Sequence, residues 1–118
     1  MRSEKISFAG VALLAGSRCG DGTTTGPRSC TSSSCHGTAQ MAGLDLRSGP
    51  SYASLVSVRA TSEPILRVIP GDPDGSYLVI KLEGRQSVGD RMPQTGSPLD
   101  TVDLTNIRNW ISQGALNN

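Results

Sequence analysis

Large apolar side chains are scarce in this chain, and the scarcity limits what it can fold into. Of the 99 residues from Gly20 onward, 25 are Leu, Ile, Val, Met, Tyr or Trp, and three of these are aromatic. The 14 Gly and 7 Pro make 21 of the 118 residues. Small domains often rely on disulfides, metals or bound groups. The sequence therefore predicts one domain whose core is completed by something other than side chains.

Composition and charge exclude several classes of protein. No apolar run reaches the roughly 20 residues of a membrane-spanning helix, so an integral membrane protein is not expected. The 11 Lys and Arg balance the 10 Asp and Glu and form no basic cluster. A nucleic-acid partner is therefore not expected either.

The N-terminus has the pattern of an export signal. Basic residues precede an apolar run from Phe8 to Ala15, and small residues suited to cleavage follow it. Residues 1–17 are therefore predicted to direct export to the periplasm or cell envelope. One alternative is lipidation at Cys19, which would anchor the chain to a membrane, and another is a helix that stays in the fold.

A small, polar stretch follows the predicted signal. Residues 18–28 are rich in Gly and Thr, a composition typical of a flexible linker. The folded domain is predicted to cover residues 29–118.

Two cysteines and the sole histidine cluster in one short segment. Cys30 and Cys35 are separated by four residues, and His36 follows directly. Haem-attachment motifs have two cysteines separated by two residues and followed by His, because two thiols reach one porphyrin edge while the His reaches the iron. An ideal helix would point residues i and i+5 about 140° apart. The Thr-Ser-Ser-Ser spacer is a poor helix former and permits a loop instead.

Other chemistry is open to the same residues. A Cys30–Cys35 disulfide suits an exported protein. A zinc site needs four ligands, and this segment offers three. A catalytic cysteine with His36 as its base lacks an evident third group to orient the pair. Haem attachment is the interpretation that this cluster of two cysteines and one histidine favours, although its spacer is longer than that of the usual motif.

A methionine is the expected second ligand of a haem iron here, because the chain has one His. Met1 is the initiator, and Met41 lies only five residues after His36. Met92 lies in a stretch punctuated by Gly and Pro, between Gly89 and Gly96. Met92 is therefore the predicted sixth ligand.

Three segments have the apolar spacing of short helices. The first is expected within residues 50–59. The second is expected to begin after Asp72 as its N-cap and to end before Gly84. The third is expected to begin after Asp100 and to end at Gly114.

The apolar side chains of these segments are expected to form the core. They are Tyr52, Leu55, Val56, Tyr77, Leu78, Leu82, Leu104, Ile107, Trp110 and Ile111. Ile65–Ile69 is rich in β-forming residues but isolated, so we expect an extended segment. The predicted fold class is mainly α, with three to four short helices and long loops.

Four motifs in order resemble one known family. They are Gly43–Leu46, Val68–Leu78, Arg91–Pro93 followed by Gly96 and Pro98–Leu99, and Ile107–Ile111 followed by Gly114–Ala115. Over about residues 29–115 the chain resembles the planctomycete-type cytochrome c domain, a relative of class I cytochromes c. The resemblance implies a small helical domain around one haem c.

The resemblance also implies roles for individual residues. Cys30 and Cys35 would form thioethers to the haem, His36 would be the proximal iron ligand and Met92 the distal one. The spacer between the cysteines is longer than the family's usual two residues, and the linker replaces the family's long first helix.

The expected function is one-electron transfer by an exported monohaem cytochrome. Methionine ligation raises the reduction potential, so the expected partners are redox proteins such as a dehydrogenase or another cytochrome, and no enzymatic activity is expected. The alternative is a non-redox exported module for interaction or structure, stapled by a Cys30–Cys35 disulfide.

Overall fold

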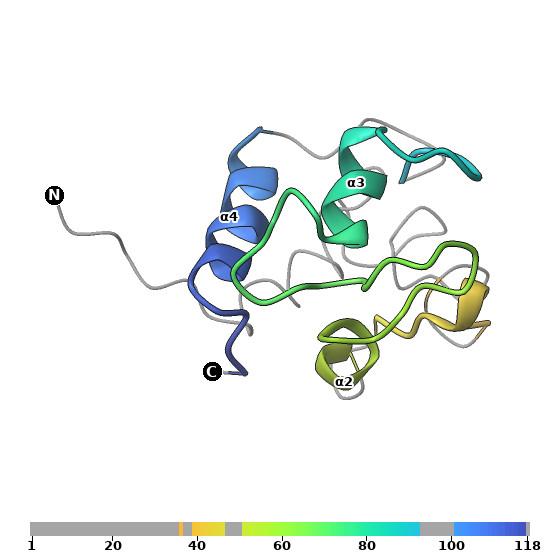
Figure 1. Cartoon of the computed structure of the whole chain (residues 1–118), viewed down its shortest axis with the longest axis horizontal. Coiled ribbons are helices and arrows are strands. Elements are labelled where there is room, and N and C mark those ends of the chain that lie inside the picture. The colour runs from red at the N-terminus through yellow and green to blue at the C-terminus, as the bar shows by residue number, and fades with distance from the viewer. Residues whose placement is uncertain (1–35, 37–38, 47–50, 93–100, 118) are drawn as a thin grey trace, which may run out of the picture.

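Short helices and long connections make up the fold (Figure 1). The structure is a computed structural model that describes residues 36, 39–46, 51–92 and 101–117. Its elements are the 3₁₀-helix η1 (Met41–Gly43) and the α-helices α2 (Ser51–Leu55), α3 (Tyr77–Glu83) and α4 (Thr101–Ser112). These residues include isolated β-bridges but no strand, so the expectation of a mainly α fold is confirmed. No helix among them is long and apolar enough to cross a membrane.

Helix α2 is much shorter than the predicted segment of residues 50–59, and that prediction is wrong in its extent. The helix ends at Leu55, and Ser57 has a left-handed φ of 60°. Val56 and Arg59 instead form bridges to Val68 and Leu66. These bridges supply the backbone hydrogen bonds that a longer helix would have made.

The stretch Ile65–Ile69 lies along the start of α3 and completes its backbone hydrogen bonding. The amide of Tyr77 donates to the carbonyl of Leu66 (3.0 Å), and that of Leu78 donates to Arg67 (2.9 Å). The first amides of a helix have no partner inside it. The segment Ile65–Ile69, called the extended segment below, lies outside the helices and forms isolated bridges, and its carbonyls accept the first two amides of α3.

The predicted N-cap of the second helix is wrong. Helix α3 begins at Tyr77, and Ser76 rather than Asp72 holds the cap position. The Asp72 carboxylate accepts from the Gly75 amide (3.0 Å), and the Ser76 hydroxyl donates to the Asp72 carbonyl (2.7 Å). These bonds close a turn over 72–76, so Asp72 caps that turn and delays the helix.

The predicted C-terminal ends of α3 and α4 are confirmed. Gly84 has φ 75° and Gly114 has φ 107°, a region that favours glycine. After each glycine an amide reaches back across the last turn: Arg85 donates to Ile80 and Ala115 donates to Trp110, both at 2.9 Å. This pattern satisfies carbonyls that a helix end leaves free. The predicted N-cap of α4, Asp100, lies outside the described residues.

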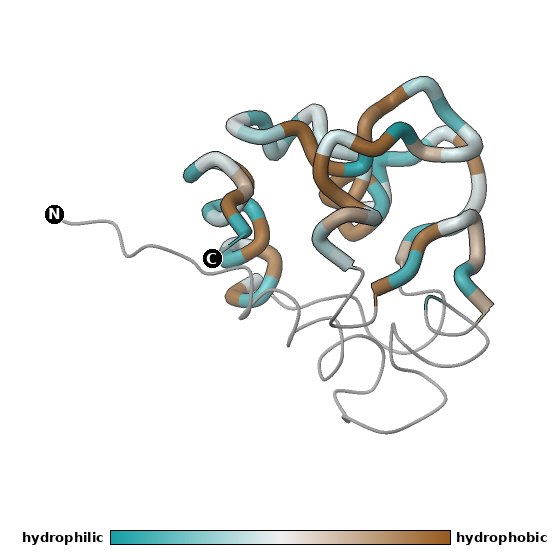
Figure 2. Tube along the Cα trace, turned by 90° about the horizontal axis from the view of Figure 1, so that it is seen from below, coloured by the Kyte–Doolittle hydropathy of each residue, from teal (hydrophilic) through white to brown (hydrophobic). Residues whose placement is uncertain are grey.

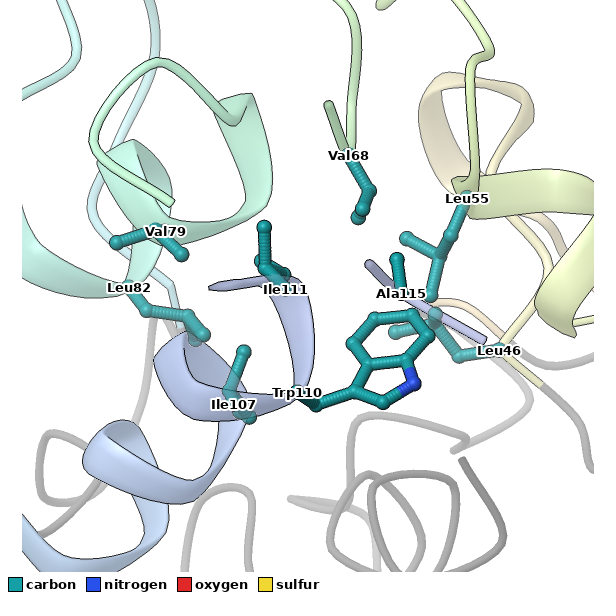
Figure 3. Close-up of a cluster of buried hydrophobic side chains, with 9 residues drawn as sticks. All are labelled: Leu46, Leu55, Val68, Val79, Leu82, Ile107, Trp110, Ile111 and Ala115. Carbon is teal, nitrogen blue, oxygen red and sulfur yellow. The ribbon is translucent and has the colours of Figure 1, made fainter. Parts of the chain in front are cut away.

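The core lies between α3, α4 and the extended segment (Figure 3). Its buried members are Leu46, Leu55, Val68, Val79, Leu82, Ile107, Trp110, Ile111 and Ala115. Tyr52, Val56, Leu78, Met92 and Leu104 pack against it while partly buried. Brown and teal residues alternate along α4 in Figure 2, as in a helix with one buried face. The core residues predicted from the sequence are therefore in or against this cluster, except Tyr77, which is buried but is not part of it.

Trp110 joins α2 to the C-terminal segment. Its ring lies edge-on to that of Tyr52, with centroids 6.4 Å apart and planes at 72°. The indole Nε1 donates to the carbonyl of Leu116 (2.9 Å), and the Tyr52 hydroxyl donates to the carbonyl of Ala115 (2.8 Å). Helix α2 and the C-terminal segment are thereby held together by aromatic packing and hydrogen bonds.

An ion-pair network ties α3 to α4 at the surface. Arg108 of α4 donates to Glu83 of α3 through Nε (3.0 Å) and to Asp74 through Nη2 (2.6 Å). Arg85 donates to the same Glu83 carboxylate (2.8 Å). Burial raises the pKa of Glu83, but hydrogen bonds and charges from the two arginines outweigh it and leave that pKa below its usual value.

Candidate haem site

His36 is half-buried, and its ring is oriented by the backbone. The Nδ1 atom lies 3.1 Å from the carbonyl oxygen of Leu44. A carbonyl only accepts, so this nitrogen carries the proton and donates it. In a neutral ring the other nitrogen, Nε2, then has its lone pair available for a metal. The amide of Leu46 donates to the His36 carbonyl (2.8 Å) and fixes the residue's backbone as well.

The loop that provides the Leu44 carbonyl has a strained backbone. Gln40 and Ala42 have φ of 48° and 56°, left-handed values that cost a non-glycine residue about 1–2 kcal/mol. Two short-range bonds hold the turn: the Gly43 amide donates to Gln40 (2.8 Å) and the Leu44 amide to Met41 (3.1 Å). Such strain persists where surrounding contacts hold the backbone in place.

Arg67 supplies such contacts from the extended segment. Its side chain is buried, with the residue 7% exposed. Nη2 donates to the carbonyl of Ala42 (2.9 Å), and Nη1 donates to that of Ser54 in α2 (2.8 Å). The Ser54 hydroxyl in turn accepts from the amide of Asp45 (3.0 Å). The loop is thus attached to α2 at two points.

The surroundings of His36 favour the neutral ring. Burial lowers the pKa of His36, backbone hydrogen bonds to Leu44 and Met41 oppose this, and the positive charges of Arg67 and Lys81 lower it further. The net pKa lies below the usual 6.5. A neutral imidazole is the form that binds metals.

Met92 lies nine residues after the end of α3 at Glu83, and its backbone is bonded back to the last turn of that helix. Its amide donates to the carbonyl of Lys81 (3.0 Å), and the neighbouring Arg91 donates through Nε to the carbonyl of Leu82 (3.3 Å). The Met92 side chain is partly buried against the core. Met41 in η1 is 56% exposed. Of these two methionines, Met92 is therefore the one that packs inside the molecule.

Lys81 is linked to both predicted iron ligands. Its charge acts on His36, and its carbonyl holds the Met92 amide. Its Nζ donates to the carbonyls of Asp90 (2.9 Å) and Val88 (3.4 Å), which fixes the segment leading to Met92. An imidazole nitrogen and a thioether sulfur are the donor set of a Met/His-ligated haem, so the donor types of His36 and Met92 match that group.

The remaining predicted site residues lie outside the described part of the chain. These are Cys19, Cys30 and Cys35, together with the loop after Met92 and the predicted export signal and linker. Within the described ranges no three His, Cys, Asp or Glu side chains form a metal-binding group.

Two contributors to the site were not predicted from the sequence. The Leu44 carbonyl is a backbone atom, and no side-chain pattern points to it. Arg67 had a signal: it is a charged residue inside the apolar stretch Ile65–Ile69, where charge is unusual unless it has buried partners.

Comparison with known proteins gave no match: no family model, no curated protein and no solved structure matches the chain.

Proposed function

We propose that this protein is a monohaem c-type cytochrome that carries single electrons. The observation that carries the proposal is the hydrogen bond from His36 Nδ1 to the Leu44 carbonyl. The bond makes Nδ1 the protonated nitrogen and leaves the lone pair of the neutral ring on Nε2. This ring belongs to the only histidine, which directly follows a cysteine pair. Histidines that bind metals usually donate their other ring nitrogen to a carbonyl or carboxylate in this way.

Four residues would hold the haem. Cys30 and Cys35 would form the thioethers, and His36 and Met92 would be the axial ligands. When bound, the group supplies an iron that cycles between the ferrous and ferric states. The resemblance to planctomycete-type cytochromes c and the partly buried position of Met92 support this assignment.

The protein's own residues would set how readily the site takes up an electron. Arg67 and Lys81 bring positive charge to the surroundings of His36. Positive charge favours the reduced state, and a Met ligand acts in the same direction. The expected role is therefore to accept electrons from a dehydrogenase and to pass them to an acceptor of higher potential.

Export belongs to the same proposal, because haem is attached to c-type cytochromes outside the cytoplasm. We propose that residues 1–17 are removed, with lipidation at Cys19 as the alternative that would tether the protein to a membrane. Intact-mass measurement of the mature protein distinguishes these forms. A mature chain that still begins at Met1 would contradict export.

The decisive experiment is expression with a cytochrome c maturation system, followed by a haem stain of a denaturing gel. The expected result is a stained band in wild type, weaker staining for Cys30→Ala or Cys35→Ala alone, and none for the double variant. A pyridine haemochrome spectrum then reports how many thioethers form. A colourless wild-type protein would overturn the proposal. Absence of free thiols at Cys30 and Cys35 in that protein would favour the disulfide-stapled module instead.

A further inference from the structure

The loop that orients His36 would not keep its shape through its own short-range bonds alone. Gln40 and Ala42 are both left-handed without being glycine. The backbone conformation that places the Leu44 carbonyl next to the ring is therefore strained, and contacts from outside the loop must stabilise it.

Two side chains from outside the loop donate to the Ala42 carbonyl: the exposed Thr61 hydroxyl (3.2 Å) and the buried guanidinium of Arg67. Arg67 is the one that also reaches α2. Nη2 bonds the carbonyl of Ala42, one of the strained residues, while Nη1 bonds Ser54 in α2, with 2.9 and 2.8 Å to the two oxygens. A planar guanidinium reaches two acceptors in fixed directions, whereas a lysine ammonium is a single point charge. The two bonds fix the loop relative to α2, two residues before Leu44.

We propose that Arg67 is a positioning residue for His36: its two-carbonyl bridge holds the left-handed loop in the conformation that presents the Leu44 carbonyl to Nδ1. The proposal extends the haem proposal, because it assigns how the iron-binding nitrogen is aimed. It also concerns a hydrogen bond of the chain itself, so it can be tested whether or not haem is present.

The test uses the purified full-length protein and measures solvent exchange of the His36 Nδ1–H proton by NMR, in the reduced state if haem is bound. Arg67→Lys keeps the positive charge but cannot donate to two carbonyls in fixed directions. Exchange of the His36 Nδ1–H proton should be about tenfold faster in this variant, the factor for losing about one ordinary hydrogen bond. Arg67→Gln should do the same and serves as the second variant if Arg67→Lys folds poorly. The matched control is Arg59→Lys, an exposed arginine paired to the same segment through the Arg59–Leu66 bridge.

A second proton separates positioning from general destabilisation. The Trp110 Nε1–H donates to Leu116 in the core region, and its exchange should change less than about twofold in every variant. If haem is bound, the reduction potential should also rise in Arg67→Lys, because the imidazole becomes a weaker donor without its partner.

Each outcome decides the question. Unchanged His36 exchange in Arg67→Lys and Arg67→Gln would overturn the proposal, and so would equal acceleration at His36 and Trp110, which would indicate a merely structural role. A colourless wild-type protein would refute the proposed function alone. The exchange comparison on that same protein would still decide the role of Arg67.

Discussion

Tyr52 and Tyr77 should respond in opposite ways to the same substitution. The Tyr52 hydroxyl donates to the carbonyl of Ala115 at 2.8 Å, and Ala115 is fully buried. Tyr52→Phe keeps the ring against Trp110 and removes this bond, so the Ala115 carbonyl loses a donor inside the core. Leaving a buried group unpaired costs about 1–3 kcal/mol, and we expect about 1–2 kcal/mol because Tyr52 itself is only half-buried.

For a domain of this size, that loss corresponds to a fall in Tm of about 4–16 °C. Tyr77 is the matched control, because its hydroxyl is buried and has no hydrogen-bond partner among the described residues. Tyr77→Phe removes an unsatisfied group and keeps the ring beneath Lys81, so Tm should stay the same or rise. Thermal unfolding followed by far-ultraviolet circular dichroism measures both. Equal falls in Tm for the two variants, or none for Tyr52→Phe, would refute the reasoning.

Three further predictions concern the site and the surface. Met92→Ala should open the distal side of a haem that Cys30 and Cys35 still hold. The charge-transfer band of Met-ligated ferric haem should then disappear, and carbon monoxide should bind the reduced form. Met41→Ala, at an exposed position, should keep the band and exclude carbon monoxide. Because the pKa of Glu83 is lowered in the folded state, its ionised form stabilises the fold at pH values above the unfolded pKa of 4.5. This stability is lost as pH falls through the folded pKa. The urea midpoint should therefore drop less on acidification in Glu83→Gln than in wild type. In protein prepared without haem, the lowered pKa of His36 means that the unfolded chain takes up the proton first, so stability should decline as pH falls through 6.5, and His36→Gln should flatten that decline.

Sequence periodicity located the ends of α3 and α4 and the beginning of α4, but it missed the beginning of α3 and the end of α2. Gly84 and Gly114 end α3 and α4 as expected, because a left-handed glycine is a local requirement that a single residue meets. The start of α3 depends on where the extended segment lies, since Leu66 and Arg67 accept its first amides. No window of residues around Asp72 contains that information. The same holds for α2, which ends where Val56 pairs with Val68.

In the candidate site, too, some features could be predicted from the sequence and others could not. His36 and Met92 could be chosen from the sequence because residue type and scarcity single them out. The carbonyl of Leu44 and the bridge of Arg67 depend on backbone conformation at Gln40 and Ala42, and neither residue type predicts a positive φ. The residue types of the candidate ligands can be read from the sequence, whereas the orientation of the His36 ring depends on contacts between distant residues.

The sequence separation of the contacts bears on the order in which the molecule assembles. The bond between His36 and Leu44 spans 8 residues, whereas that between Tyr52 and Ala115 spans 63. Loop-closure entropy makes the longer contact about 1.8 kcal/mol more costly to form from an open chain. The Arg67 contact that holds the loop spans 25 residues, also fewer than 63, so the turn around the histidine can order while α4 is still undocked. If a cofactor binds before folding is complete, this order is favourable, because the segment around His36 forms first and α4 docks last.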